Sequence, residues 1–553
     1  MSTRLYLGDE ALAQGAIDAG LSGAYAYPGT PSTEITEHVQ RHVAETSQRI
    51  HCRWSANEKT ALEEAIGMSL AGRRAMASMK HVGLNVAADP FMNAALIGTR
   101  GGLLINVADD PSMHSSQNEQ DSRLYADMAL IPCIEPADQQ QAYEAPGVAF
   151  ELSEQFELPV MIRLTTRLAH SRADVKVGAE EPSPQNPFSL PDDRQRFILL
   201  PERARRRYQW LLSQQPALET ASEESPFSHL VLEGDPSLGI ISCGLASNYV
   251  REALGDAVGH PWLQIGQYPL PARLIHTLFS TCQRIIVLEE GYPFVESRLR
   301  GLPLRSTPKL LGRLSGHLPR TGELAPEEVT NVLRSPDAPP SPRQASPSSI
   351  VRSRPPVLCQ GCPHIDSYRA LNQAMAPHRE RGRVFADIGC YTLGAMPPLE
   401  SIDTCLCMGA SITMAKGAAD AGAFPAVAVI GDSTFAHSGL TGLLDCTAEH
   451  TPITALLLDN DTVAMTGGQD SQATGRFVGL CESLGVDREH IVRITPRADL
   501  HEENVVKIAR ELAYEGPSVV LAQRACIQTL RRSKATEKSS ASPDRRRSEG
   551  GQP

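Results

Sequence analysis

The chain has 553 residues, which exceeds the size of one hydrophobic core, so we expect roughly two to four domains. Its composition of 41% hydrophobic and 21% charged residues is typical of a soluble globular protein, and its net charge of −12 argues against a nucleic-acid-binding protein. No apolar run reaches the ~18 residues that a transmembrane helix needs, and the 12 cysteines, in a chain that opens without an apolar signal core, indicate reduced thiols in a cytoplasmic setting.

The first segment, residues 1–185, alternates apolar strands with helical patterns. Residues 56–72 (ANEKTALEEAIGMSLAG) carry apolar side chains at helical spacing, with Asn57 placed to cap the helix. This alternation predicts a parallel sheet with helices on both faces. The strands predicted in this segment are residues 23–30, 75–81 and 101–110.

A connector and a second α/β segment follow. Residues 186–227 contain a polar amphipathic helix at 200–216, and residues 228–335 repeat the pattern of strands and helices. The Pro/Ser-rich stretch at 336–356 is the clearest boundary in the chain, and we expect it to be a linker. The strands predicted in the second segment are residues 238–244, 262–271 and 284–291.

The third α/β segment spans residues 357–526. It is followed by a polar, charged tail at 527–553, which we expect to be disordered. The strands predicted in this segment are residues 383–389, 426–432, 453–460 and 517–523.

Two polar side chains end neighbouring strands of the third segment. Asp432 follows the apolar run AVAVIG, and Asn460 follows ALLLD, 460 − 432 = 28 positions later. Ligands bind at the carboxyl ends of parallel strands, and Mg²⁺ favours oxygen ligands such as these two side chains and a backbone carbonyl near Thr462. Turn residues that merely cap a strand or a helix remain an alternative for both positions.

Longer stretches around these positions carry a family resemblance. GDSTFAHSGLTGLL and LLLDNDTVAMTGGQ resemble the thiamine-diphosphate domain in the large (alpha) subunit of indolepyruvate ferredoxin oxidoreductases, which belong to the 2-oxoacid:acceptor oxidoreductases. YPGTPSTEI and NEKTALEEAIGMSLAG, nearer the N-terminus, also resemble this family, so the resemblance covers about residues 1–526.

The resemblance implies an α/β fold of three doubly wound domains. A pyrimidine-binding domain (1–185) and a diphosphate-binding domain (357–526) would flank a transketolase C-terminal-like domain (228–335). Thiamine diphosphate and Mg²⁺ are the implied cofactors, and the implied metal ligands are Asp432, Asn460 and Thr462. Ser433 replaces a glycine of the wider thiamine motif. The residues expected to bind the cofactor are Glu58, Gly361, Cys362, Cys390, Gly431, Asp432, Ser433, Asn460, Met465 and Thr466.

Thiamine chemistry also needs a carboxylate beside the aminopyrimidine ring, and the resemblance favours Glu58. Glu63 and Glu64 lie further along the same predicted helix and are alternatives, and any of the three could instead lie on a solvated face.

Further catalytic candidates lie on neighbouring loops of the first segment. Thr30 matches a position that contacts substrate or cofactor in the family, although Thr-Pro-Ser-Thr-Glu also reads as a helix start. His81 and His114, together with Lys80 and Asn118, are candidates for contacts with substrate or cofactor; a structural role is the alternative for each. The arginine that clamps the carboxylate in a pyruvate-oxidising relative is absent from VADDPSMH, which argues against a small substrate.

Cys359 and Cys362 form a Cys-x-x-Cys pair without a second pair at zinc-finger spacing. The family normally ends in a ferredoxin-like domain with two Cys-x₂-Cys-x₂-Cys-x₃-Cys-Pro runs, and this sequence contains no such run. We therefore expect no iron–sulfur cluster in this chain. A partner subunit or a diffusible oxidant would then accept the electrons released when the 2-oxoacid is oxidised.

The resulting hypothesis is oxidative decarboxylation of arylpyruvates, such as indolepyruvate or phenylpyruvate, to an acyl-CoA or the aryl acid. A non-oxidative 2-oxoacid decarboxylase or lyase is the alternative, and a non-enzymatic remnant is a third. The resemblance implies a small beta-type partner subunit and either a homodimer or an α2β2 assembly. Coenzyme A and a 2-oxoacid are the implied small-molecule partners, and no binding to a membrane is expected.

Overall fold

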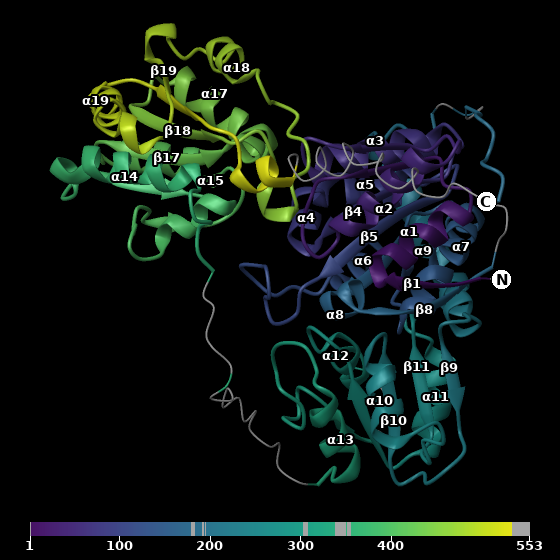
Figure 1. Ribbon diagram of the computed structural model, residues 1–553. Coiled ribbons are helices and arrows are strands. Elements are labelled where there is room, and N and C mark those ends of the chain that lie inside the picture. The colour runs from purple at the N-terminus through teal and green to yellow at the C-terminus, as the bar shows by residue number, and fades with distance from the viewer. Residues whose placement is uncertain are drawn as a thin grey trace, which may run out of the picture. The chain divides into compact units, whose positions relative to one another are not determined.

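The structure is a computed structural model that describes residues 2–178, 183–190, 193, 195–301, 308–337, 350 and 356–532 (Figure 1). These residues belong to two compact units, Met1–Ser346 and Pro347–Pro553. Nearly all of the predicted linker at 336–356 and most of the predicted tail at 527–553 lie outside the described residues. The predicted domain boundaries stay predictions.

The first unit contains a seven-stranded sheet of order β12-β6-β7-β5-β4-β2-β3. All its strands are parallel except β12, which pairs antiparallel with β6. The order of the parallel strands is that of an open, doubly wound sheet. The strands are β2 (Gly23–Ala26), β3 (His51–Trp54), β4 (Ala75–Lys80), β5 (Leu103–Asp109), β6 (Cys133–Ile134), β7 (Val160–Thr165) and β12 (Gln267–Tyr268).

Helices follow the strands of this sheet as the sequence predicts. The Asn57 side chain accepts a hydrogen bond from the Thr60 N–H at 2.9 Å, which confirms it as the cap of α3. The helices packed around the sheet are α1 (Gly8–Asp18), α2 (Thr33–Glu45), α3 (Glu58–Leu70), α4 (His81–Val86), α5 (Ala88–Ile97), α6 (Arg123–Ala129), α7 (Gln139–Phe156) and α8 (Thr166–His170). An antiparallel pair, β1 (Ser2–Leu7) and β8 (Arg172–Val177), lies beside them.

A second sheet of the first unit has the order β14-β13-β10-β11-β9 and is mixed, because β9 runs antiparallel to β11. The connecting helix α9 extends beyond the predicted 200–216. The strands are β9 (His229–Val231), β10 (Gly239–Cys243), β11 (Trp262–Ile265), β13 (Arg284–Leu288) and β14 (Lys309–Leu311). The helices are α9 (Pro201–Glu223), α10 (Ala246–Leu254), α11 (Ala272–Thr281), α12 (Phe294–Arg300) and α13 (Pro326–Arg334).

The single strand predicted at 262–271 is wrong, because the chain changes sheets within it. β11 belongs to the mixed sheet, whereas β12 joins the seven-stranded sheet beside β6. The switch occurs at Gly266, where a Cβ atom would lie 2.5 Å from the Phe227 carbonyl oxygen. One continuous hydrophobic core therefore serves both sheets of the first unit.

The second unit contains a six-stranded, all-parallel sheet of order β16-β15-β17-β18-β20-β19. The strands are β15 (Arg383–Ala386), β16 (Thr404–Cys405), β17 (Ala426–Gly431), β18 (Ile453–Asp459), β19 (Ile491–Ile494) and β20 (Ser518–Gln523). The helices are α14 (Pro363–Met375), α15 (Ala410–Asp420), α16 (Asp432–Thr434), α17 (Leu440–Ala448), α18 (Phe477–Ser483) and α19 (His501–Leu512). A π-helical turn, Phe435–Gly439, joins α16 to α17.

Each face of this sheet has its own core, which explains the uninterrupted apolar runs in its strands. Val427 and Val429 enter the core shared with α14 and α19, whereas Ala428 and Ile430 enter the core shared with α15 and α17. Helices thus cover both faces of the sheet (Figure 1), as expected for a buried parallel sheet. Among the helices described in either unit, none is long and apolar enough to cross a membrane.

Candidate functional site

Two adjacent strands of the six-stranded sheet bring the predicted metal ligands together. β17 ends at Gly431 and is followed by Asp432, and the neighbouring β18 ends at Asp459 and is followed by Asn460. The side chains of Asp432 and Asn460 meet at the Thr462 N–H: Asp432 Oδ2 and Asn460 Oδ1 each accept a hydrogen bond from it at 3.2 Å. The predicted donors therefore lie close together.

A tight turn between these donors produces this convergence. Asp461 adopts a left-handed backbone conformation, with φ of 64°, that few residues other than glycine favour. The turn reverses the chain directly after β18, so that Asn460 and Thr462 both face Asp432. Strained backbone of this kind is concentrated at ligand-binding loops.

The electrostatics of Asp432 suit a bound cation. Its side chain is buried, and within the described part of the chain it forms no ion pair. Burial, with a smaller contribution from the Asp459 carboxylate, raises the pKa of Asp432 to about 7, against the opposing effect of the Ser433 N–H. A desolvated carboxylate that converges with an amide oxygen fits a Mg²⁺ ion whose remaining ligands are phosphate oxygens.

His364, near the start of α14, holds the Asn460 amide in place. The His364 ring is buried, and burial lowers its pKa to about 4, so it is neutral near pH 7. An unprotonated Nε2 can accept a hydrogen bond from the Asn460 Nδ2–H group, 3.2 Å away. This contact leaves Asn460 Oδ1 as the atom that faces Asp432.

Gly431 is required by close packing. A Cβ atom on Gly431 would lie 2.6 Å from Cε1 of Tyr391, whose hydroxyl donates to the buried carboxylate of Asp387. Asp387 also accepts hydrogen bonds from the Ser411 hydroxyl at 2.6 Å and from the Gly409 N–H at 3.2 Å, so it caps the start of α15.

The other residues predicted to bind cofactor occupy the same edge of the sheet or the loop after β18. Ser433 is buried beside Asp432, and the Ser433 N–H donates to that carboxylate at 2.6 Å. Met465 is 52% exposed on the short helical turn Ala464–Thr466, where the Thr466 hydroxyl donates to Gln469 at 2.5 Å. No contact tests a role in cofactor binding for these residues.

Four cysteines from three segments of the second unit lie close enough together for their charges to interact. Burial, followed by the charges of Cys362, Cys526 and Cys359, raises the pKa of Cys390 to about 12. Cys526 follows β20, and its N–H donates to the Asn460 carbonyl oxygen at 3.0 Å. Four cysteine thiols are the usual ligand set of an iron–sulfur cluster. The expectation that this chain carries no cluster stays a prediction, and this arrangement argues against it.

Glu58 is the buried member of the three glutamates considered on α3. Its carboxyl group packs against Gly83, where a Cβ atom would lie 2.6 Å from Glu58 Oε1. Glu63 and Glu64 are exposed, and they pair with Lys59 and with the Ser55 hydroxyl. The burial of Glu58 supports its predicted role without testing it.

Thr30, on the loop after β2, and Lys80, at the end of β4, both contact Ser115. The Thr30 carbonyl oxygen accepts from the Ser115 hydroxyl at 3.3 Å, and the Lys80 ammonium donates to the Ser115 carbonyl oxygen at 3.1 Å. Burial lowers the pKa of Lys80, although Asp110 and Glu58 oppose the shift. Lys80 therefore lies within electrostatic reach of Glu58.

The two predicted histidines differ in their surroundings. His81 is buried, with Nε2 3.2 Å from the Asn118 carbonyl oxygen and with no hydrogen-bond partner for Nδ1 among the described residues. His114 is exposed and forms an ion pair with Glu323, which also binds Arg167. These contacts favour a structural role for His114.

Three residues of the second unit were missed as members of the site: His364, Asp387 and Cys526. Each touches its partners from a segment far away in sequence; His364 and Asn460, for example, are 96 positions apart. The short motifs CPH and DIGC contain His364 and Asp387 and were their only signal in the sequence, and Cys526 belongs to no motif.

Two protein families match this chain, one in each of its two units. Residues 14–216 match the family "Pyruvate flavodoxin/ferredoxin oxidoreductase, thiamine diP-bdg", and residues 387–522 match "Thiamine pyrophosphate enzyme, C-terminal TPP binding domain". A solved structure of 2-oxoglutarate:ferredoxin oxidoreductase from Magnetococcus marinus aligns with a TM-score of 0.48 at 17% identity, over 60% of this chain and 65% of that chain.

Subunits of indolepyruvate oxidoreductase are similar to this chain over most of its length. The indolepyruvate oxidoreductase subunit IorA of Archaeoglobus fulgidus is 38% identical over 96% of this chain and 88% of its own length. The IorA subunits of Methanothermobacter thermautotrophicus and Pyrococcus abyssi are 37% and 34% identical, over 94% of this chain and 86% and 85% of their own lengths. The chain therefore belongs to the family of indolepyruvate oxidoreductase IorA subunits, with thiamine-diphosphate-binding domains in both units.

Proposed function

We propose that the chain binds thiamine diphosphate through Mg²⁺ and, together with a small beta-type subunit, oxidatively decarboxylates arylpyruvates such as indolepyruvate or phenylpyruvate. The observation that carries this proposal is the convergence of Asp432 and Asn460 on the Thr462 N–H at the carboxyl edge of the six-stranded sheet. IorA relatives named as indolepyruvate oxidoreductase subunits support the substrate class.

The residues of this chain would act by binding and positioning. Asp432, Asn460 and the Thr462 carbonyl would hold the metal, and His364 would keep the Asn460 oxygen turned toward it. When bound, thiamine diphosphate supplies an electron sink for cleavage of the bond between the carboxylate and the keto carbon. Glu58 would hold a proton beside the aminopyrimidine ring.

The overall reaction releases two electrons that need an acceptor. The 2-oxoacid and coenzyme A yield CO₂, an acyl-CoA, one proton and two electrons, as the C1–C2 bond breaks and a carbon–sulfur bond forms. We propose that Cys359, Cys362, Cys390 and Cys526 would hold an iron–sulfur cluster, which would supply a one-electron acceptor for this reaction. Its position at the edge of the sheet that carries Asn460 supports this role.

Product analysis tests the reaction. The complex of this chain and its partner subunit is incubated anaerobically with phenylpyruvate, coenzyme A and a viologen dye. We expect dye reduction in step with CO₂ release and formation of phenylacetyl-CoA. Release of phenylacetaldehyde without dye reduction would instead establish the non-oxidative decarboxylase.

Metal analysis tests the cluster separately. Protein purified without oxygen should be brown and contain iron and sulfide, and Cys526→Ser should lose both. Cys407→Ser, which changes an exposed cysteine outside the group of four, is the matched control. Colourless protein that contains no iron after reconstitution would refute the cluster and leave the electrons to the partner subunit.

A further inference from the structure

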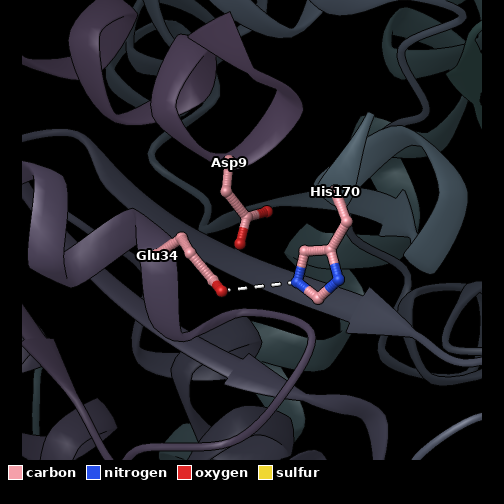
Figure 2. A group of neighbouring side chains, drawn as sticks. All are labelled: Asp9, Glu34 and His170. Atoms are coloured by element: carbon pink, nitrogen blue, oxygen red, sulfur yellow. Dashed lines mark ion pairs between the residues drawn. The ribbon is translucent and has the colours of Figure 1, made fainter. Parts of the chain in front are cut away.

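Three side chains of the first unit that have no role in the site described above converge on one another. Asp9 lies in the first turn of α1, Glu34 in the first turn of α2, and His170 at the end of α8, and Figure 2 shows their polar ends pointing toward one another. One ligand atom from each lies within 4.8 Å of the others, and Glu34 Oε2 lies 3.4 Å from His170 Nε2.

The backbone brings two of the three residues, Asp9 and His170, near each other. The antiparallel pair β1–β8 ends with Leu7 opposite Arg172. Asp9 and His170 each lie two residues beyond that pair, so the sheet register places them near each other.

Asp9 is the unusual member of the group. Its side chain is fully buried, and neither carboxylate oxygen has a hydrogen-bond partner among the described residues. Its neighbour Glu10 is turned instead toward Arg41 and the Leu7 N–H. Burial, followed by the charges of Glu34 and Glu10, raises the pKa of Asp9 well above its usual value. A buried carboxyl group with two unsatisfied oxygens needs a proton or a cation.

We propose that Asp9, Glu34 and His170 bind a divalent transition-metal ion of the zinc class. Two carboxylate oxygens and an imidazole nitrogen suit Zn²⁺, whereas Mg²⁺ and Ca²⁺ prefer oxygen ligands alone. Bonds of about 2.0–2.2 Å place the ligand atoms of one ion about 3–4 Å apart, so small movements of the side chains complete the site. The side chains of Glu34 and His170 are 32% and 34% exposed, so part of the group lies near solvent.

Such an ion would act on structure. It would join the ends of β1 and β8 to the start of α2, which follows the loop that carries Thr30. The ion would therefore stabilise the first unit and hold that loop, and it is independent of the Mg²⁺ proposed at Asp432.

Zinc stoichiometry tests the site. The full chain, stripped with EDTA and saturated with thiamine diphosphate and Mg²⁺, is loaded with ZnCl₂, gel-filtered and analysed by mass spectrometry of its metals. Asp9→Asn and His170→Gln should each retain one zinc equivalent fewer than the wild type, whereas Glu45→Gln, at the exposed far end of α2, should match it. Zinc bound by the cysteines contributes equally to the wild type and the three variants, because all of them contain the same cysteines.

Thermal unfolding provides a second measurement. Zinc should raise the melting temperature of the wild type and of Glu45→Gln more than that of the two site variants. The partly exposed His170→Gln keeps the test decisive if Asp9→Asn fails to fold. Equal zinc content in wild type and His170→Gln would overturn the proposal and identify Asp9 as a protonated, metal-free carboxyl group.

Discussion

A buried ion-pair network of the first unit and two buried carboxylates of the second unit differ in how their charges are compensated. In the first unit, Asp109, Asp121 and Glu135 surround Arg123 and Arg163, whose side chains are at most 1% exposed and form ion pairs of 2.6–3.7 Å. Although burial acts to raise the pKa of Asp121, the two arginines bring it below its usual value.

In the second unit the buried Glu511 pairs with Arg510, whereas Asp387 and Asp432 form no ion pair with an arginine or lysine among the described residues. Asp387 and Asp432 are held by hydroxyls and backbone N–H groups, and burial raises their pKa values to about 6 and about 7. The first arrangement joins the two sheets of its unit through ion pairs. Asp432 has no such ion pair among the described residues, which supports the cation site proposed there.

The strongest test of this comparison removes the uncompensated carboxylate. Asp432→Ala should abolish Mg²⁺-dependent binding of thiamine diphosphate, since a lost ligand costs more than the 10–100-fold typical of a lost outer partner. Isothermal titration of the full chain measures it. The substitution also removes an unfavourable buried charge, so the variant should unfold no earlier than the metal-free wild type. Unchanged affinity would show that Asp432 is only a turn residue.

Glu58 is a buried carboxylate of the first unit that lies within electrostatic reach of Lys80. Glu58→Gln should slow exchange of the thiamine C2 proton by about 10²–10⁴-fold, the usual contribution of a positioned acid or base, while the cofactor stays bound. Proton NMR in D₂O follows the exchange. Glu63→Gln, an exposed change on the same helix, should behave as wild type; slow exchange in that variant instead would move the role to Glu63.

Removing a buried arginine should lower the stability of the fold and should not weaken cofactor binding. Arg163→Met removes the arginine partner of Asp109 and one of the two arginine partners of Glu135, and it should lower the free energy of unfolding by about 3–5 kcal/mol. Arg273→Met, at an exposed pair with Glu223, should cost less than about 1 kcal/mol. Chemical unfolding followed by circular dichroism compares the two. A similar loss for both would mean that the buried network contributes no more than a surface pair.

The fold was largely predictable because its central strands are buried on both faces. Runs such as AVAVIG and ITALLLD read as strands without any tertiary information. The change of sheets at Gly266 was not predictable, since it depends on the approach of Phe227 from another segment. Two-residue strands such as β6 and β12 leave no periodic signal at all.

The candidate metal ligands could be predicted for a related reason. Asp432 and Asn460 each follow a readable strand, and the ends of adjacent parallel strands share one edge. His364 and Cys526 could not be assigned to that edge, because their contacts with Asn460 come from helix α14 and from the segment after β20. Residues that act through a neighbour distant in the sequence form no motif of fixed spacing with it.

The contact that orients Asn460 gives a smaller, graded effect. His364→Phe keeps a buried ring but removes the acceptor for Asn460 Nδ2, so the apparent Mg²⁺ affinity should fall about 10–100-fold. His378→Phe, beyond the far end of α14, should leave it unchanged. Titration of Mg²⁺ at saturating thiamine diphosphate measures both. Equal affinities in the two variants would mean that the Asn460 amide is oriented without His364.

The smallest effect follows from the raised pKa of Asp432 itself. Mg²⁺ binds the ionised carboxylate, so below a pKa of about 7 the ion must displace a proton. The apparent Mg²⁺ affinity should therefore be about tenfold weaker at pH 6 than at pH 8, after correction for the titration of the cofactor phosphate. The metal-free fold shows the opposite trend: because it binds the proton more tightly than the unfolded chain does, it loses stability as the pH rises from about 4 to 7. Asp432→Asn cannot titrate and should show neither trend at this position, and a pH dependence that survives in it would assign the proton to Asp387 or another neighbouring group.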